Sequence, residues 1–265
     1  PSRQAELFGG GATDLRLDNP ISSELDAMRP SLLANLITAA ARNNDRGAGN
    51  AAMFELGSIY TNDTPEGQKM NASGIRCHMA IPRHWAGGTR SVDVFDAKAD
   101  ALAVLSHCKI STDKVRSEAV APDWYHPGRS ARLMLGPKIV LGNYGEIHPS
   151  VLERLDIIGP IVGFEIFLES VPVPKRTTSY TRSRLSYIDF PIVERDFSFV
   201  VDSDVPSADV VNAAAGADRQ LIKDVEVFDV YMGEGINDGQ KSIALTVRIE
   251  PLKRTLTEAE IEEVS

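Results

Sequence analysis

The sequence predicts an α+β protein made of two domains, each built on an antiparallel sheet. Its 265 residues exceed the usual size of one small domain, and 43% of them are hydrophobic while 25% are charged, which is typical of a globular chain. Short candidate strands separated by turns favour antiparallel pairing, and a polar, proline-tipped, basic segment at 172–184 has the composition of a linker. We therefore expect one domain over residues 1–174, a linker over 175–186 and a second domain over 187–265.

Composition also limits the possible functions. The net charge of -9 argues against a broad grip on polyanions, because such binding depends on Lys and Arg neutralising phosphates. The sequence has no apolar run of the length that a membrane span needs, and its first residues do not resemble a signal peptide. Cys77 and Cys108 lack C-x-x-C spacing, so we expect neither a disulfide framework nor a metal site. The chain is expected to be a cytoplasmic fragment that does not contact membranes.

The first domain opens with a helix predicted over residues 31–42. Pro30 stands near its first turn, and Leu32, Leu33, Leu36 and Ile37 recur at helical spacing. This apolar stripe fits two structures, a plain hydrophobic core or a subunit interface.

Further elements of the first domain follow from alternation and turn residues. A strand is predicted over 53–60, an exposed loop over 61–71 and an Ala/Leu-rich helix over 97–107. Short strands and one short helix complete the domain, at 125–130, 131–135, 139–142, 145–149, 151–155 (the helix) and 162–168.

The second domain shows the order strand, helix, strand, strand, helix. Its predicted elements are a strand at 196–202, a helix from Pro206 to Gly216, strands at 225–232 and 242–249, and a helix opened by a capping box at 257–260. This order is that of a ferredoxin-like βαββαβ module lacking its last strand, an architecture whose open sheet face can hold single-stranded RNA.

The two strands joined by the Gly-rich turn carry a candidate binding site. If Phe228 and Val230 share the buried face with Ile243, then alternation places Asp229, Tyr231 and Ser242 together on the other face. A nucleobase could stack on the ring while the carboxylate accepts its edge N–H groups. An ordinary polar outer face remains the alternative.

Four polar residues of the first domain raise a further alternative, a hydrolase. His126, Arg129, Glu146 and His148 could support acid/base chemistry, but the sequence carries no Gly-x-Ser-x-Gly elbow, His-Glu-x-x-His pair or P-loop. The histidines stand next to turn residues, and we expect them to be satisfied by local hydrogen bonds.

The chain resembles the C-terminal part of the bacterial phenylalanyl-tRNA synthetase (phenylalanine-tRNA ligase) beta subunit. The order and spacing of several short strings carry this resemblance over nearly the whole chain, namely 19–24, 28–33, 54–57, 126–130, 145–149, 195–196, 228–231 and 241–242.

The resemblance implies a catalytically inactive class II synthetase-like domain followed by a ferredoxin-fold anticodon-binding domain. It implies an alpha-subunit partner in an (αβ)2 heterotetramer, with ATP, Mg and phenylalanine used in the alpha subunit and no cofactor held by this chain. Asp229, Tyr231 and Ser242 would contact the first anticodon base of tRNA(Phe), a guanine, and Lys241 and Arg248 its backbone. Leu32, Leu33, Leu36 and Ile37 would face the alpha subunit. A stand-alone RNA-binding module without a synthetase partner is the competing hypothesis.

Overall fold

The computed structural model describes residues 1–173, 190–251, 254, 255 and 257. The chain divides into two compact units, Pro1–Thr177 and Thr178–Ser265, which we call the first and the second unit. The predicted linker at 175–186 and, apart from Thr257, the helix predicted from 257 lie outside the described residues. Among the described residues no helix combines the length and the hydrophobicity needed to cross a membrane.

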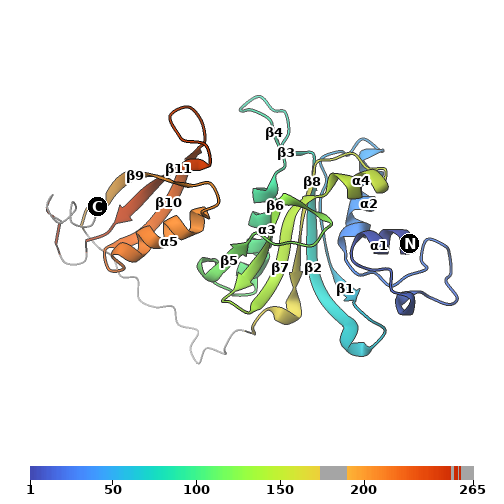
Figure 1. Cartoon of the computed structure of the whole chain (residues 1–265). Helices are drawn as coiled ribbons and strands as arrows, with labels where there is room; N and C mark the ends of the chain where they lie inside the picture. The colour runs from blue at the N-terminus through green and yellow to red at the C-terminus, as the bar shows by residue number, and fades with distance from the viewer. Residues whose placement is uncertain (174–189, 252–253, 256, 258–265) are drawn as a thin grey trace. The chain divides into compact units, whose positions relative to one another are not determined.

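The first unit is a large antiparallel sheet with helices on both faces (Figure 1). Its strands and α-helices are α1 (Ser2–Leu7), α2 (Leu33–Asn44), β1 (Ala52–Tyr60), β2 (Gln68–Cys77), β3 (Met79–Ile81), β4 (Arg90–Ser91), α3 (Val94–His107), β5 (Val115–Glu118), β6 (Tyr125–Leu135), β7 (Ile139–Ile147), α4 (Pro149–Arg154) and β8 (Ile161–Phe167). The six-stranded sheet has the order β1-β2-β8-β7-β6-β5, and β3 pairs with β4 separately.

Alternation along β8 explains why both faces of this sheet are covered. Val162, Phe164 and Ile166 face the cluster that includes α3, whereas Ile161 belongs to the cluster that includes α2. A strand buried on both sides reads as a nearly continuous apolar run, as β8 does apart from Glu165.

Helix α2 forms core, which corrects one prediction. Leu32, Leu33 and Ile37 have no exposed surface and Leu36 is 5% exposed, so the chain itself buries the whole stripe. The expectation that these four residues leave a partly covered face for the alpha subunit is wrong. Periodicity reports which side of a helix is apolar but not what covers it.

Strand β2 occupies sequence that we expected to be partly exposed loop. Asn71 lies within it and is fully buried, and Ser73 beside it is 1% exposed. The strand was missed because the side chains that it buries at this end are polar, so the hydrophobic alternation typical of strands is absent. The strands predicted separately at 125–130 and 131–135 form one strand, β6, with a register shift between Tyr125 and Ser130 that accommodates Pro127 and Gly128.

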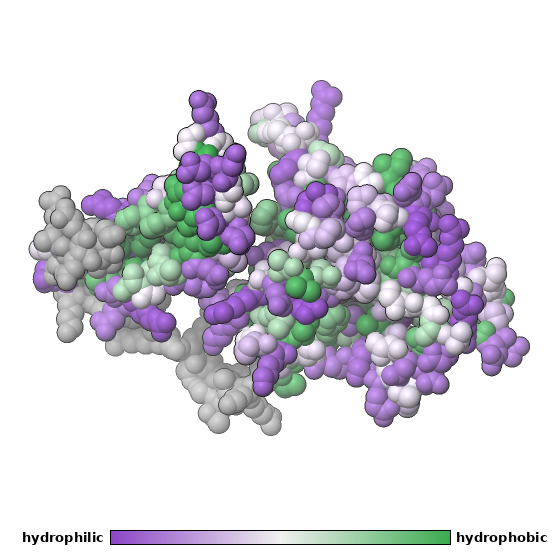
Figure 2. Space-filling view, viewed as in Figure 1, coloured by the Kyte–Doolittle hydropathy of each residue, from purple (hydrophilic) through white to green (hydrophobic). Residues whose placement is uncertain are grey.

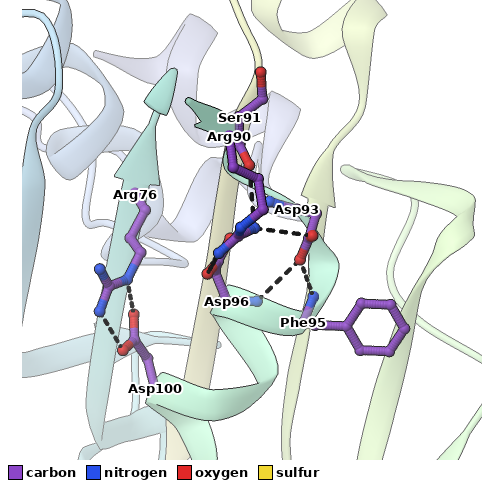
Figure 3. A network of polar contacts seen from close by, with 7 residues as sticks. All are labelled: Arg76, Arg90, Ser91, Asp93, Phe95, Asp96 and Asp100. Atoms are coloured by element: carbon purple, nitrogen blue, oxygen red, sulfur yellow. Dashed lines mark hydrogen bonds and ion pairs between the residues drawn. The ribbon is translucent and has the colours of Figure 1, made fainter. Parts of the chain in front are cut away.

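A polar network holds the start of α3 (Figure 3). Asp93 accepts hydrogen bonds from the backbone N–H groups of Phe95 and Asp96, and the Asp96 side chain accepts from the Asp93 N–H, which is a capping box. The Arg90 guanidinium lies 2.7 Å from Asp96 Oδ1 and 3.0 Å from Asp93 Oδ2. On β2, Arg76 makes a bidentate ion pair with Asp100 of α3. The network fixes α3 to the strands that flank it.

The second unit follows the predicted order strand, helix, strand, strand. Its elements are β9 (Val193–Asp202), α5 (Ser207–Ala217), β10 (Ile222–Tyr231) and β11 (Gln240–Ile249), and its sheet has the order β10-β11-β9. Helix α5 packs mainly on β10 and also contacts β11, over the face that carries Ile243 and Leu245. Figure 2 shows apolar surface (green) on the second unit, and the partly exposed Phe199 and Val230 belong to this helix-side face by register.

Candidate RNA-binding face

The face of the second unit opposite α5 is covered by no described element, and strand register arranges its side chains in rows. Because directly paired residues of an antiparallel sheet point to the same side, Tyr231, Ser242 and Val200 form one row. Asp229, Ala244 and Ser198 form the next row. We call these two rows the aromatic end of the open face. Asp229, Tyr231 and Ser242 therefore do share a face, as alternation predicted.

A β-bulge at Phe228 decides which residues of β10 reach the open face. Val227 pairs with Leu245 and Asp229 pairs with Ala244, so Phe228 is the extra residue. Strict alternation would have placed Val227 on the same face as Asp229, whereas the register places it on the helix side. The expectation that Phe228 is buried on the same face as Ile243 is wrong, since Phe228 is the bulged residue and is 57% exposed. Val230, which pairs with Ile243, does lie on that face.

Local contacts hold the Tyr231 ring while leaving it accessible. The side chain is 47% exposed, and its hydroxyl donates a hydrogen bond to the carbonyl oxygen of Glu234 at 3.3 Å. A Cβ at position 233 would lie 2.5 Å from the Tyr231 hydroxyl oxygen and 2.7 Å from Cζ, so glycine is required for the backbone to approach the ring so closely. The ring is thereby positioned before any ligand arrives.

Hydroxyl groups continue the polar surface beside the ring. Ser242 Oγ lies 2.8 Å from Ser198 Oγ across the β11 and β9 pair. The motif-based prediction named Ser242 but missed Ser198 and Val200, which complete the two rows. The alternation of Ser198 and Val200 along β9 was a signal in the sequence, but the partner strand was needed to place them.

The two basic residues predicted to contact an RNA backbone do not join this group. Lys241 pairs with Val201 on the helix side, and its Nζ donates to the carbonyl oxygen of Ser203 at 2.8 Å. Arg248 lies on the open face but at its other end, where its Nη2 is 2.8 Å from Glu194 Oε1. Hydrogen bonding to Glu194 raises the pKa of Arg248 above its ordinary value. The structure thus separates both cations from Tyr231, and their predicted role loses its geometric support.

The polar residues considered for hydrolysis lie in the first unit, with His126 and Arg129 in β6, Glu146 in β7 and His148 at the N-cap of α4. His126 Nδ1 accepts from the Gly128 N–H and His148 Nδ1 from the Ser150 N–H, both at 3.1 Å, so each ring is satisfied by a backbone group two residues along the chain. The two rings stack with centroids 6.1 Å apart. Arg129 and Glu146 form an ion pair with each other, 3.0 Å between Nη2 and Oε1. The arrangement favours the structural interpretation of these residues.

The described residues contain no cluster of side chains suited to bind a metal ion. In the described part of the chain no three side chains of His, Cys, Asp or Glu converge as metal ligands. Cys77 is 3% exposed, and burial raises the pKa of its thiol to about 11, so it stays protonated at neutral pH.

Two family models match the chain, one for each unit. Residues 2–168 match the Phenylalanyl tRNA synthetase beta chain CLM domain, and residues 189–265 match the Ferredoxin-fold anticodon binding domain.

Proteins with similar sequences are phenylalanine-tRNA ligase beta subunits. The chain is 51% identical over 263 residues to the phenylalanine-tRNA ligase beta subunit of Bartonella quintana, with 98% of this chain and 33% of that protein covered. It is 47% identical over 266 residues to the same subunit of Brucella suis (99% and 33% covered) and 48% identical over 264 residues to that of Paramagnetospirillum magneticum (100% and 33%). The chain spans about a third of the length of these relatives.

Among solved structures, the pyrrolysyl-tRNA synthetase of Desulfitobacterium hafniense is similar over 64% of this chain and 57% of that one. The identity is 18% and the TM-score 0.45, too low to establish a common fold. The two family matches and the identity to the beta subunits confirm the resemblance inferred from the motifs. The chain therefore belongs to the phenylalanyl-tRNA synthetase beta chain family and carries a CLM domain followed by a ferredoxin-fold anticodon-binding domain.

Proposed function

We propose that this chain is the C-terminal part of a phenylalanine-tRNA ligase beta subunit whose second unit reads the anticodon of tRNA(Phe). The observation that carries this proposal is the position of Asp229, Tyr231 and Ser242, side by side on an uncovered sheet face in a chain that matches an anticodon-binding family. In this proposal the domains span 1–174 and 187–265, joined by a linker at 175–186.

Recognition would divide between stacking and hydrogen bonding. The first anticodon base, a guanine, stacks on the ring of Tyr231, which is worth roughly 1 to 3 kcal/mol per base and tolerates any base. Asp229 accepts the adjacent N–H donors of the Watson-Crick edge of guanine, whereas adenine presents an acceptor at that edge. Ser242, paired with Tyr231 in register, supplies a hydroxyl beside the same base. Stacking therefore gives affinity and the carboxylate gives the choice of base.

The first unit would act as a scaffold, a class II synthetase-like domain without catalysis, that pairs with the alpha subunit in an (αβ)2 heterotetramer. An apolar surface on the edge strand β1 supports this pairing, because Phe54 is 84% exposed and Leu56 is 60% exposed. Phe54 also lines a groove of about 370 Å³ that reaches Val104 on α3. Exposed apolar surface of this kind commonly marks a protein interface.

The chemistry of the ligase would take place elsewhere in the assembly. ATP, Mg and phenylalanine would be used at an active site of the alpha subunit, so this chain supplies tRNA positioning and assembly. A ligase of this kind works on tRNA in the cytoplasm, where we place the protein.

Two substitutions in the complete ligase test the anticodon proposal. Tyr231→Ala should lower kcat/KM about equally for tRNA(Phe) with guanine or adenine as first anticodon base, because stacking does not distinguish them. Asp229→Asn should instead narrow the gap between the two tRNAs by about 1 to 3 kcal/mol, the usual worth of a paired hydrogen-bonding contact to a base. The measurement is charging efficiency for each tRNA with each variant.

Matched variants separate recognition from damage to the fold. Tyr231→Phe keeps the ring and should charge like wild type, and Asp209→Asn removes a charge from α5, on the opposite side of the sheet. An unchanged preference for guanine in Asp229→Asn would contradict the assigned role. Failure of the chain to co-purify with an alpha subunit would favour the stand-alone RNA-binding module instead.

A further inference from the structure

The open face of the second unit changes character halfway along the strands. Beyond the aromatic end, Glu226, Thr246 and Asp196 form the third row by register. Asp224, Arg248 and Glu194 form the fourth row. All four carboxylate side chains in these rows are exposed to solvent. We call the third and fourth rows the acidic end.

The acidic end has little positive charge to offset its carboxylates. Arg248 is engaged by Glu194, with Nε at 3.2 Å and Nη2 at 2.8 Å from the same Oε1 atom. Register assigns Arg195 to the helix side, opposite Val247, as it does Lys241. Lys223 is the unpaired residue of a second register shift, between Ile222 and Asp224. Among the paired residues of β9, β10 and β11, the acidic end therefore presents a net negative surface.

The two ends are close enough for this charge to act on a ligand of the aromatic end. Successive rows are two residues apart along β11, which corresponds to about 7 Å at about 3.4 Å per residue. The Debye length is about 10 Å at 0.1 M salt, so the repulsion of a phosphate placed one row beyond Asp229 is only partly screened. Thr246, on the central strand β11, donates to Asp196 Oδ1 at 2.7 Å, which fixes the carboxylate of Asp196 in the third row.

We infer that Glu194, Asp196, Asp224 and Glu226 are specificity determinants that act by exclusion, keeping a nucleic-acid backbone off half of the sheet. RNA then reaches the face with one extruded base at the aromatic end. An RNA segment whose backbone has to cross the acidic end of β9, β10 and β11 is repelled. The inference rests on the proposed function, since it concerns the same face and the same ligand, RNA.

The chemistry of the two ends supports this division. A face that binds a run of nucleotides without selection combines aromatic rings with a positively charged track for phosphates. Here the one aromatic ring of the four rows, that of Tyr231, lies at the aromatic end, and the third and fourth rows carry four carboxylates, which have the same sign of charge as RNA. Like-charge contacts are a general means of suppressing wrong partners. The bulge at Phe228 lies at the junction between the two ends.

The experiment compares complete ligase carrying Asp196→Asn with Glu226→Gln against wild type. Dissociation constants are measured for tRNA(Phe) and for a non-cognate tRNA at about 0.05 M and about 0.5 M salt. We expect the double variant to bind the non-cognate tRNA roughly five- to tenfold more tightly at low salt, with the gain falling below about twofold at high salt as the charges are screened. Binding of tRNA(Phe) should change by less than about twofold, because its base occupies the aromatic end.

Control variants make the outcome decisive. Asp204→Asn with Asp209→Asn removes the same charge from the turn before α5 and from α5 itself, and should leave both tRNAs unaffected. Glu226→Gln alone provides a second variant that preserves the hydrogen bond between Thr246 and Asp196.

Two results would overturn the inference. An equal gain in the control double variant, or no gain in either acidic-end variant, refutes exclusion by these residues. If Tyr231→Ala still impairs charging in that case, the proposed function stands and the inference alone fails. A Tyr231→Ala ligase that charges like wild type overturns both.

Discussion

Glu165 is a carboxyl group buried in the first unit, where three side chains donate hydrogen bonds to it. Ser31 Oγ lies 2.6 Å from its Oε1, and Trp124 Nε1 and the Tyr125 hydroxyl lie 3.3 and 3.4 Å from its Oε2. Ser31 Oγ also accepts the N–H of Leu33, so the group ties the start of α2 to the centre of the sheet. Burial raises the pKa of Glu165 above its ordinary value, and the three donors offset part of that increase.

The raised pKa of Glu165 predicts a pH dependence of stability. Between the unfolded value, about 4.5, and the higher folded value, the folded protein holds a proton that the unfolded chain releases, so the free energy of unfolding falls as pH rises. Glu165→Gln should flatten this slope, because the amide does not titrate and its carbonyl can still accept from Ser31. Urea denaturation from about pH 5 to about pH 8 measures it. The exposed Glu153→Gln is the control, and equal slopes in wild type and Glu165→Gln would contradict the prediction.

At the scale of single elements, the N-terminus of α3 depends on its cap. The Asp93 side chain accepts hydrogen bonds from two of the first backbone N–H groups of the helix. These N–H groups have no carbonyl acceptor within the helix, so they lose their partner without Asp93. Its ion pair with Arg90 is exposed, with 44% and 48% of the two side chains accessible, and exposed pairs contribute little. We therefore expect the hydrogen bonds of the Asp93 cap to contribute more to the stability of α3 than the ion pair between Arg90 and Asp93.

We expect Asp93→Ala to lower the free energy of unfolding by about 1 kcal/mol, within a range of about 0.5 to 2. Asp93→Ser should retain most of the stability because its hydroxyl can accept the same N–H groups. Arg90→Ala should cost less than Asp93→Ala. Chemical denaturation of the 265-residue chain gives all three values, and a larger loss in Arg90→Ala than in Asp93→Ala would show that the ion pairs dominate.

At the scale of the whole molecule, we expect Leu36 to affect folding stability, and Phe54 and Leu56 to affect assembly with an alpha subunit. Leu36→Ala removes a core side chain and should cost about 2 to 5 kcal/mol of folding stability. Phe54→Ser with Leu56→Ser changes exposed positions and should alter stability by less than about 1 kcal/mol while reducing co-purification with an alpha subunit. Normal assembly of the Phe54 and Leu56 double variant would remove β1 from the interface.

A second prediction at this scale concerns catalysis. The purified 265-residue chain, free of alpha subunit, should not support phenylalanine-dependent exchange between ATP and pyrophosphate, because the proposed function places the use of ATP and phenylalanine in the alpha subunit. The complete ligase, with alpha and beta subunits, is the positive control. Exchange by the chain alone would refute the scaffold role.

Much of the fold was predictable from local patterns. The apolar spacing of α2, the Ala/Leu run of α3 and the alternation in β9 and β11 each reflect a periodicity that a chain segment carries by itself. Strand β2 was not predictable in this way, since Asn71 and Ser73 are polar and buried. A polar side chain is buried when neighbouring elements enclose it, and that information lies outside the segment.

By itself, the sequence determined the family, through short strings in a specific order, and the identity of the three side chains proposed to read a base. Tertiary structure alone decided three further points: that Leu32, Leu33, Leu36 and Ile37 are core, that Lys241 turns away from Tyr231, and that the bulge at Phe228 divides an aromatic end from an acidic end. The physical reason is that strand register and burial are relations between segments. A segment specifies which of its sides is apolar, while the partner strand or helix specifies what that side meets.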